Sequence, residues 1–174
     1  MGFDKATLMI DGKPLWQRQL ATLRATQPGE LLISGRPDGP YSGEGVPIIV
    51  DDVPDAGPLG GLATLLHIAK HPLVLVLAID LPDMTAEWLA RLVQIGSAIP
   101  VRDRQLEPLA AFYPKAAAPI AERLLAKGQR SMRNFAHELF YRGLAKPLTL
   151  SGADSALFRN LNTPEDVTNG SRDE

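Results

Sequence analysis

Asp80 is the acidic residue whose position best suits chemistry, because it directly follows an unbroken aliphatic run from 73 to 79. Such a run is typical of a central parallel strand that is covered on both faces. Ligands of α/β sheets gather beyond the carboxyl ends of the strands, where a carboxylate can hold Mg²⁺ against the phosphates of a nucleotide. Asp80 would serve equally well as the start of a turn before Pro82, and spacing alone does not separate these two roles.

The second candidate is the segment from 51 to 61, Asp-Asp-Val-Pro-Asp-Ala-Gly-Pro-Leu-Gly-Gly, which lies between a predicted strand and a predicted helix. Glycines let a ligand approach the backbone, and the N-terminus of a helix favours an anionic group. The carboxylates of Asp51 and Asp52 could accept hydrogen bonds from a base or a ribose, or could lie in solvent. The pattern is neither G-x-G-x-x-G nor a P-loop, so Gly60 and Gly61 would also be explained by close helix packing.

Three further polar residues stand near the ends of the chain. Lys5, taken alone, has the character of a surface lysine. The segment from 160 to 166, Asn-Leu-Asn-Thr-Pro-Glu-Asp, predicts a helix start in which Asn162 or Thr163 is the cap and a proline occupies the first turn. Asn160 has no part in such a cap and therefore remains a candidate binding residue.

Composition excludes several classes of function. The 174 residues include no cysteine, which rules out disulfides and cysteine nucleophiles, and the net charge of −2 leaves no basic stripe for nucleic acid. The longest apolar run is too short to span a bilayer. The N-terminus lacks the pattern of a secretory signal. We therefore expect a cytoplasmic protein with neither nucleic acid nor a membrane as partner.

The elements that would position these residues alternate between strands and helices. Strands are predicted at 30–34, 47–50, 73–79, 99–101, 109–113 and near 148, and helices at 14–27, 59–70, 85–96, 115–127, 131–141 and from about 163. Thr85 is the expected cap of its helix. Alternation with short loops predicts a three-layer α/β fold with a mostly parallel sheet. Residues 1–174 then form a single domain.

Taken in order along the chain, these segments resemble the molybdenum cofactor guanylyltransferases. The resemblance rests on Asp52 and on the collinear segments 1–6, 11–16, 57–62, 80–82, 107–110, 128–131 and 160–164. It implies a Rossmann-like nucleotidyltransferase fold of the nucleotide-diphospho-sugar transferase type. It also implies transfer of GMP from GTP to molybdenum-bearing molybdopterin, with release of pyrophosphate and with Mg²⁺ as cofactor.

The same resemblance assigns roles residue by residue. Lys5 would bind the phosphates of GTP, Asp52 would lie near the guanosine, and Asp80 would hold Mg²⁺, so that Lys5 and Asp80 are the catalytic residues. Asn160 and Asn162 would lie toward molybdopterin. Molybdenum-cofactor assembly proteins or molybdoenzymes would be the protein partners.

Two alternatives accompany this interpretation. One is a cytidylyl- or sugar-phosphate nucleotidyltransferase, and the other is a non-catalytic relative that acts as a binding partner in cofactor assembly. The family's signature also begins earlier, with an apolar strand and a Leu-x-Gly-Gly-x-Ser-x-Arg loop that would precede Met1. On this basis the sequence as written is expected to be N-terminally truncated relative to the family and to bind GTP weakly.

Overall fold

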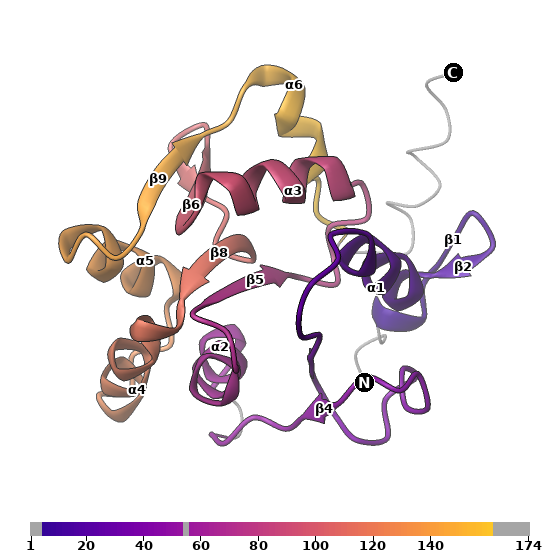
Figure 1. The fold of residues 1–174 in the computed structure, drawn as a ribbon, viewed down its shortest axis with the longest axis horizontal. Coiled ribbons are helices and arrows are strands. Elements are labelled where there is room, and N and C mark those ends of the chain that lie inside the picture. Colours follow the sequence, from indigo (N-terminus) through magenta and orange to yellow (C-terminus); the bar gives the residue numbers. More distant parts are fainter. Residues whose placement is uncertain (1–4, 54–55, 162–174) are drawn as a thin grey trace.

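The structure is a computed structural model that describes residues 5–53 and 56–161 (Figure 1). Its helices are α1 (Leu15–Ala25), α2 (Pro58–Ile68), α3 (Ala86–Ile95), α4 (Ala118–Ala126), α5 (Met132–Tyr141) and the short α6 (Gly152–Ser155), with 3₁₀ turns at Lys5–Thr7, Lys115–Ala117 and Ala156–Phe158. Its strands are β1 (Met9–Ile10), β2 (Lys13–Pro14), β3 (Ile33–Ser34), β4 (Ile48–Ile49), β5 (Leu73–Leu77), β6 (Ala98–Arg102), β7 (Gln105–Leu106), β8 (Ala110–Pro114) and β9 (Lys146–Thr149). The predicted helix from about 163 lies outside the described residues.

A five-stranded sheet forms the middle layer, with the order β5-β8-β6-β7 and with β9 paired to β6. Helices cover both faces: α1 and α3 lie on one side, and α2, α4 and α5 lie on the other (Figure 1). Strands β3 and β4 form a separate parallel pair. The three-layer α/β class predicted from the sequence is therefore present.

The sheet is mixed rather than mostly parallel, which corrects the prediction. Strand β8 runs antiparallel to both β5 and β6, and only β9 is parallel to β6. A parallel neighbour needs a crossover of a dozen or more residues, and the connection from 103 to 109 between β6 and β8 is shorter than that. The aliphatic run at β5 reflects packing of both strand faces against helix-covered cores, with Val74 and Val76 on one side and Leu75 and Leu77 on the other, and such packing does not depend on strand direction.

Alternate residues of the central strands pack into two separate hydrophobic cores, one on each face of the sheet. Ala111 and Tyr113 of β8 join the core beneath α2, α4 and α5, whereas Ala110 and Phe112 join the core beneath α3. Strand β5 divides in the same way, because successive side chains of a strand point to opposite faces. Hydrophobic packing on both faces consequently holds the sheet in place, and the sheet in turn positions the residues at its strand ends.

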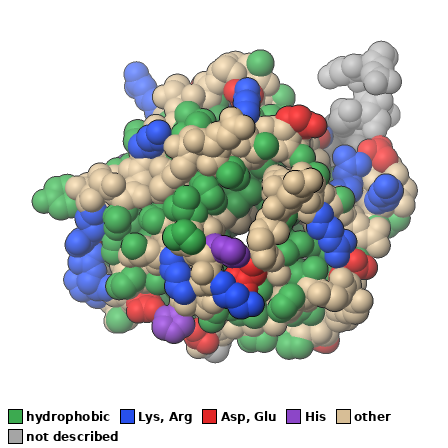
Figure 2. Space-filling view, in the orientation of Figure 1, with side chains coloured by type: hydrophobic (Ala, Val, Ile, Leu, Met, Phe, Trp, Pro, Cys, Tyr) green, Lys and Arg blue, Asp and Glu red, His purple; other side chains and the backbone are tan. Residues whose placement is uncertain are grey.

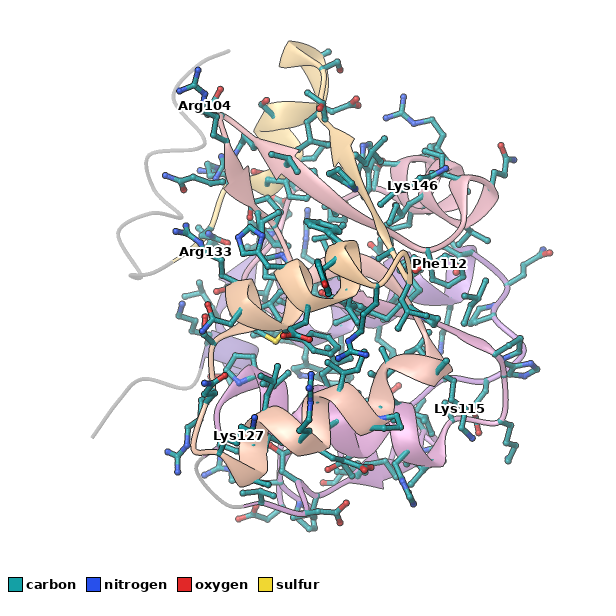
Figure 3. All side chains as sticks on the ribbon, turned by 90° about the vertical axis from the view of Figure 1, so that its left-hand side faces the viewer. Arg104, Phe112, Lys115, Lys127, Arg133 and Lys146 are labelled. Atoms are coloured by element: carbon teal, nitrogen blue, oxygen red, sulfur yellow. The ribbon has the colours of Figure 1, made fainter. Side chains whose placement is uncertain are left out.

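The cap that the sequence predicts for α3 has the expected local structure. The side chain of Thr85 accepts a hydrogen bond from the backbone of Trp88 at the start of α3, which confirms Thr85 as the cap. Helices α4 and α5 lie side by side, and Lys127 after α4 and Arg133 in α5 sit at one edge of this layer (Figure 3). Among the described residues, no helix has the length and apolar character needed to cross a membrane.

Candidate active site at the carboxyl end of β5

A cavity of about 790 Å³ opens beside β5. In the described part of the chain, β5 pairs on one side only, with β8, and its other edge forms a wall of this cavity together with Leu32 and Ile33. The wall along the strand is aliphatic from Leu75 to Ile79. Figure 2 shows that hydrophobic side chains gather in the middle of the face seen there. The polar residues among those that line the cavity are Lys5, Gln19, Ser34, Arg36, Tyr41, Asp51 and Asp80.

Lys5 and Asp80 form an ion pair inside this cavity. The Lys5 Nζ lies 3.5 Å from the Asp80 Oδ2, and the two side chains are 34% and 26% exposed. Such partial exposure leaves both groups accessible to a ligand while water screens their charges less than on an open surface. The structure thus brings together, from opposite parts of the chain, the two residues that the sequence analysis named as catalytic.

Asp80 is held in place through its neighbours' backbone. The buried side chain of Gln19 on α1 donates hydrogen bonds to the carbonyls of Ala78 (3.1 Å) and Leu81 (2.6 Å), on either side of Asp80. The carbonyl of Asp80 itself accepts from the Leu161 N–H at 2.9 Å. These bonds fix the direction in which the Asp80 carboxylate leaves the strand.

Replacing Gln19 by methionine tests this anchoring. We expect the free energy of unfolding to fall by about 1–3 kcal/mol, because two partly buried carbonyls lose their donor. Urea denaturation measures the change. The matched control is Gln17→Met, since Gln17 lies on the same helix but is exposed, and it should alter stability by no more than about 0.5 kcal/mol. Equal losses in both variants would contradict the anchoring role.

Asp51, rather than Asp52, belongs to the cavity wall. The Ser34 hydroxyl donates to the Asp51 Oδ1 at 2.9 Å, which ties the ends of β3 and β4 together. Asp52 is exposed and its backbone N–H donates to the Thr64 hydroxyl at 3.1 Å. The pair Asp51–Ser34 therefore presents hydrogen-bonding oxygens toward the cavity at the position where the sequence analysis expected Asp52.

Gly61 of α2 packs directly against this pair. A Cβ at position 61 would lie 2.5 Å from the Ser34 Oγ and 3.0 Å from the Asp51 Oδ1. The first distance is too short for any real contact, so an alanine there requires the Ser34 hydroxyl to rotate away from Asp51. Close approach of α2 to the pair thus explains a glycine in the middle of a helix.

Gly61→Ala gives the second prediction. Overpacking costs about 1–3 kcal/mol, whereas alanine gains about 1 kcal/mol over glycine in a helix, so a net destabilisation of up to about 2 kcal/mol is expected. In a Ser34→Ala background the nearest clash disappears, and Gly61→Ala should cost less or become neutral. Denaturant unfolding of the four proteins in this cycle measures the coupling. Strict additivity would show that Gly61 does not press on Ser34.

Of the two asparagines predicted for the acceptor side, only Asn160 lies within the described residues. Asn160 is exposed and directly precedes Leu161, whose N–H is bonded to Asp80. Asn162 lies outside the described residues. The backbone at Leu161 is therefore anchored beside Asp80.

The oxygen donors at this site fit a magnesium ion that also binds substrate phosphates. Mg²⁺ is commonly held by one or two carboxylates together with phosphate oxygens and water, and Asp80 supplies a partly exposed carboxylate in a polar part of the cavity. Within residues 5–53 and 56–161 there is no group of three or more acidic, histidine or cysteine side chains arranged to hold a metal. The site suits a cation that arrives with a nucleotide better than a permanently bound one.

Solved structures of other proteins show the fold class of this protein. The chain superposes on the crystal structure of molybdopterin-guanine dinucleotide biosynthesis protein A from Archaeoglobus fulgidus with a TM-score of 0.73 at 24% identity, over 97% of this chain and 89% of that one. It also superposes on 2-C-methyl-D-erythritol 4-phosphate cytidylyltransferase from Thermus thermophilus with a TM-score of 0.70 at 21% identity, over 94% and 90% of the two chains. The fold is that of the nucleotidyltransferases, which confirms the predicted fold class.

Sequence relatives narrow this class. The family described as the MobA-like NTP transferase domain matches residues 1–142. A probable molybdenum cofactor guanylyltransferase of Opitutus terrae is 35% identical over 173 residues, covering 95% of this chain and 86% of the relative. The molybdenum cofactor guanylyltransferase of Serratia proteamaculans is 35% identical over 171 residues, covering 95% and 84%. The chain belongs to the MobA-like NTP transferase family, together with the molybdenum cofactor guanylyltransferases, as its motifs predicted.

Proposed function

We propose that this protein transfers GMP from GTP to molybdenum-bearing molybdopterin, forming the guanine dinucleotide cofactor and releasing pyrophosphate. The observation that carries the proposal is the Lys5–Asp80 pair in the cavity at the carboxyl end of β5, in a chain whose relatives are named for this reaction. A cation and a carboxylate at this edge are the groups that a magnesium–triphosphate complex requires.

The reaction needs no nucleophile from the protein. An oxygen of the acceptor's terminal phosphate attacks the α-phosphorus of GTP, a new phosphorus–oxygen bond forms, and the bond to the β-phosphate breaks with its electron pair leaving on pyrophosphate. The protein has to align the two phosphates and neutralise their charge. A site with one lysine, one carboxylate and hydrogen-bonding oxygens is sufficient for that task.

Each residue of the site then has a distinct part. Lys5 would bind the phosphates of GTP, and its ammonium group would offset negative charge as pyrophosphate leaves. Asp80 would hold Mg²⁺, which when bound supplies further neutralisation of the triphosphate. Gln19 keeps the Asp80 carboxylate pointed at the cavity through the carbonyls that flank it. Lys5 and Asp80 pair with each other, so binding of a magnesium–nucleotide complex would exchange this contact for contacts with the phosphates and the cation.

The base and the acceptor would occupy opposite sides of this pair. Asp51, which accepts a hydrogen bond from Ser34, would accept hydrogen bonds from the ribose or guanine, and the neighbouring Asp52 would lie near the guanosine. Asn160 and Asn162 would contact molybdopterin; the support for Asn160 is that the next residue, Leu161, donates its N–H to the Asp80 carbonyl. The acceptor phosphate would thus meet the α-phosphorus above the end of β5.

The wider setting follows from this reaction. We propose one nucleotidyltransferase domain that works in the cytoplasm, uses Mg²⁺ and receives its acceptor from, or delivers its product to, molybdenum-cofactor assembly proteins or molybdoenzymes. The support is the family to which the chain belongs and the absence of a membrane-spanning helix from the described residues.

A turnover assay tests the proposal and its base preference together. The protein is incubated with molybdenum-bearing molybdopterin, Mg²⁺ and either GTP or CTP, and pyrophosphate release is followed. Release with GTP at a rate well above that with CTP is the expected result. A preference for CTP would favour a cytidylyltransferase, and no release with either nucleotide would favour a non-catalytic binding protein.

A further inference from the structure

The turn between β7 and β8 lies beside the end of β5. The N–H of Ala78 donates to the carbonyl of Leu109 at 2.7 Å, which extends the β5–β8 pairing by one step toward Asp80. The fully buried Tyr113 donates its hydroxyl to the carbonyl of Pro108 at 2.6 Å. The N–H of Glu107 donates to Pro100 at 2.9 Å. The backbone around Glu107 is therefore fixed next to the candidate site.

The Glu107 side chain is paired with Arg102 of β6. The Arg102 Nε and Nη2 lie 2.9 Å and 2.8 Å from the same carboxylate oxygen, Oε1, of Glu107. The two side chains are only 13% (Glu107) and 29% (Arg102) exposed. Each side chain is less exposed than the like-charged side chain of the Lys5–Asp80 pair. The second carboxylate oxygen of Glu107, Oε2, takes no part in these two bonds.

Glu107 follows from the strand register as the residue level with Asp80. Leu77 faces Ala110 and the Ala78 N–H donates to the Leu109 carbonyl, so two further steps along each segment bring Asp80 level with Glu107. Burial raises the pKa of Glu107, Arg102 lowers that pKa, and the carboxylate of Asp80 adds a smaller upward shift. The charges alternate across the strand ends in the order Arg102, Glu107, Asp80 and Lys5. In this order Asp80 stands between the ammonium group of Lys5 and the carboxylate of Glu107.

We propose that Glu107 is a positioning residue for the cation held by Asp80, and that Arg102 limits its effect. The proposal rests on the proposed function, because it assigns Asp80 to a divalent cation. The Glu107 carboxylate adds negative potential at Asp80 and so strengthens attraction for Mg²⁺. Arg102 neutralises part of that potential. A purely structural alternative is that the Arg102–Glu107 pair merely ties the turn to β6.

The two roles differ in the sign of their effects. Glu107→Gln removes a negative charge near the cation and should weaken binding of the divalent ion by about tenfold, from Coulomb attraction in a partly screened site. Arg102→Met removes the neutralising charge, so binding should be at least as tight as in the wild-type protein. A structural tie would be lost in both variants, and both would then weaken together.

Electron paramagnetic resonance of Mn²⁺ in the presence of GDP at pH 8 measures the affinity of each variant for the divalent ion without turnover. The matched control is Asp103→Asn, because Asp103 is exposed on the same hairpin and its φ of 47° is one that asparagine tolerates. Thermal unfolding of each variant checks that the fold is retained. Tenfold weakening in Glu107→Gln, with no weakening in Arg102→Met or Asp103→Asn, is the expected result.

Three other outcomes overturn the inference. Wild-type affinity in Glu107→Gln, or equal weakening in Glu107→Gln and Arg102→Met, would show that Glu107 does not support the cation, while the proposed function would stand. If the wild-type protein binds no Mn²⁺ with GDP or GTP, the role of Asp80 fails and the proposed function fails in that respect as well.

Discussion

Asp80→Asn is expected to lower the rate of guanylyl transfer by at least about a hundredfold, the scale of losing one key electrostatic contact in a transition state. Asparagine has nearly the same shape and keeps an oxygen for the turn, so the strand end should be retained. It lacks the negative charge that Mg²⁺ requires and that pairs with Lys5. The loss should therefore appear in turnover while the free energy of unfolding changes little.

The control for this variant is Asp83→Asn. Asp83 follows Asp80 closely in sequence, but its carboxylate is bonded to Arg159, with Oδ2 2.8 Å from Nε. Asp83→Asn tests whether loss of any carboxylate charge near the end of β5 lowers the rate of guanylyl transfer. Activity close to wild type is expected for Asp83→Asn. A similar loss in both variants would indicate damage to the loop rather than loss of a metal ligand.

Lys5→Met should weaken binding of GTP by about tenfold to a hundredfold, because one charge-assisted hydrogen bond to a phosphate is worth about 1.5–3 kcal/mol. Methionine retains an unbranched aliphatic stem of similar length and removes only the ammonium group. Calorimetric titration with GTP measures the affinity. The salt dependence of binding should also become less steep, since one phosphate contact is lost.

Lys13→Met provides the comparison, because Lys13 is exposed on β2 and is absent from the residues that line the cavity. It changes the net charge of the protein by the same amount as Lys5→Met. Only Lys5→Met should lose GTP affinity if the contact is local. Loss of affinity in both would mean that Lys5 acts through overall charge and not through a phosphate contact.

Much of the fold could be predicted because its signals are local. The helix α3 has its Thr85 cap, and β5 lies within the aliphatic run from which it was predicted. Strand direction could not be predicted in this way, since it depends on which strands become neighbours. The hairpin β1–β2 was not predicted. Its turn residues Asp11 and Gly12 both have positive φ angles, and the Asp-Gly pair is the sequence signal of such a type I′ turn.

The candidate site was predicted in part for a similar reason. Asp80 follows a long apolar strand, so its place at a strand end was readable. Asp51 and Asp52 are adjacent, and strand phase decides which of the two faces the cavity; β4 is only Ile48–Ile49, too short for its phase to be read from alternation. Gln19 was visible only as a polar residue among the leucines of α1. Its bonds to Ala78 and Leu81 depend on tertiary packing.

The most direct test of the account follows the α-phosphate of GTP. The wild-type protein is incubated with molybdenum-bearing molybdopterin, Mg²⁺ and GTP labelled at the α-phosphate, and the acceptor is analysed for label, with Asp80→Asn in parallel. We predict that label enters the acceptor as the guanine dinucleotide in the wild-type reaction and is reduced at least about a hundredfold in the variant. Label transfer that is unchanged by Asp80→Asn, or labelled GTP left intact by the wild-type protein, would contradict it.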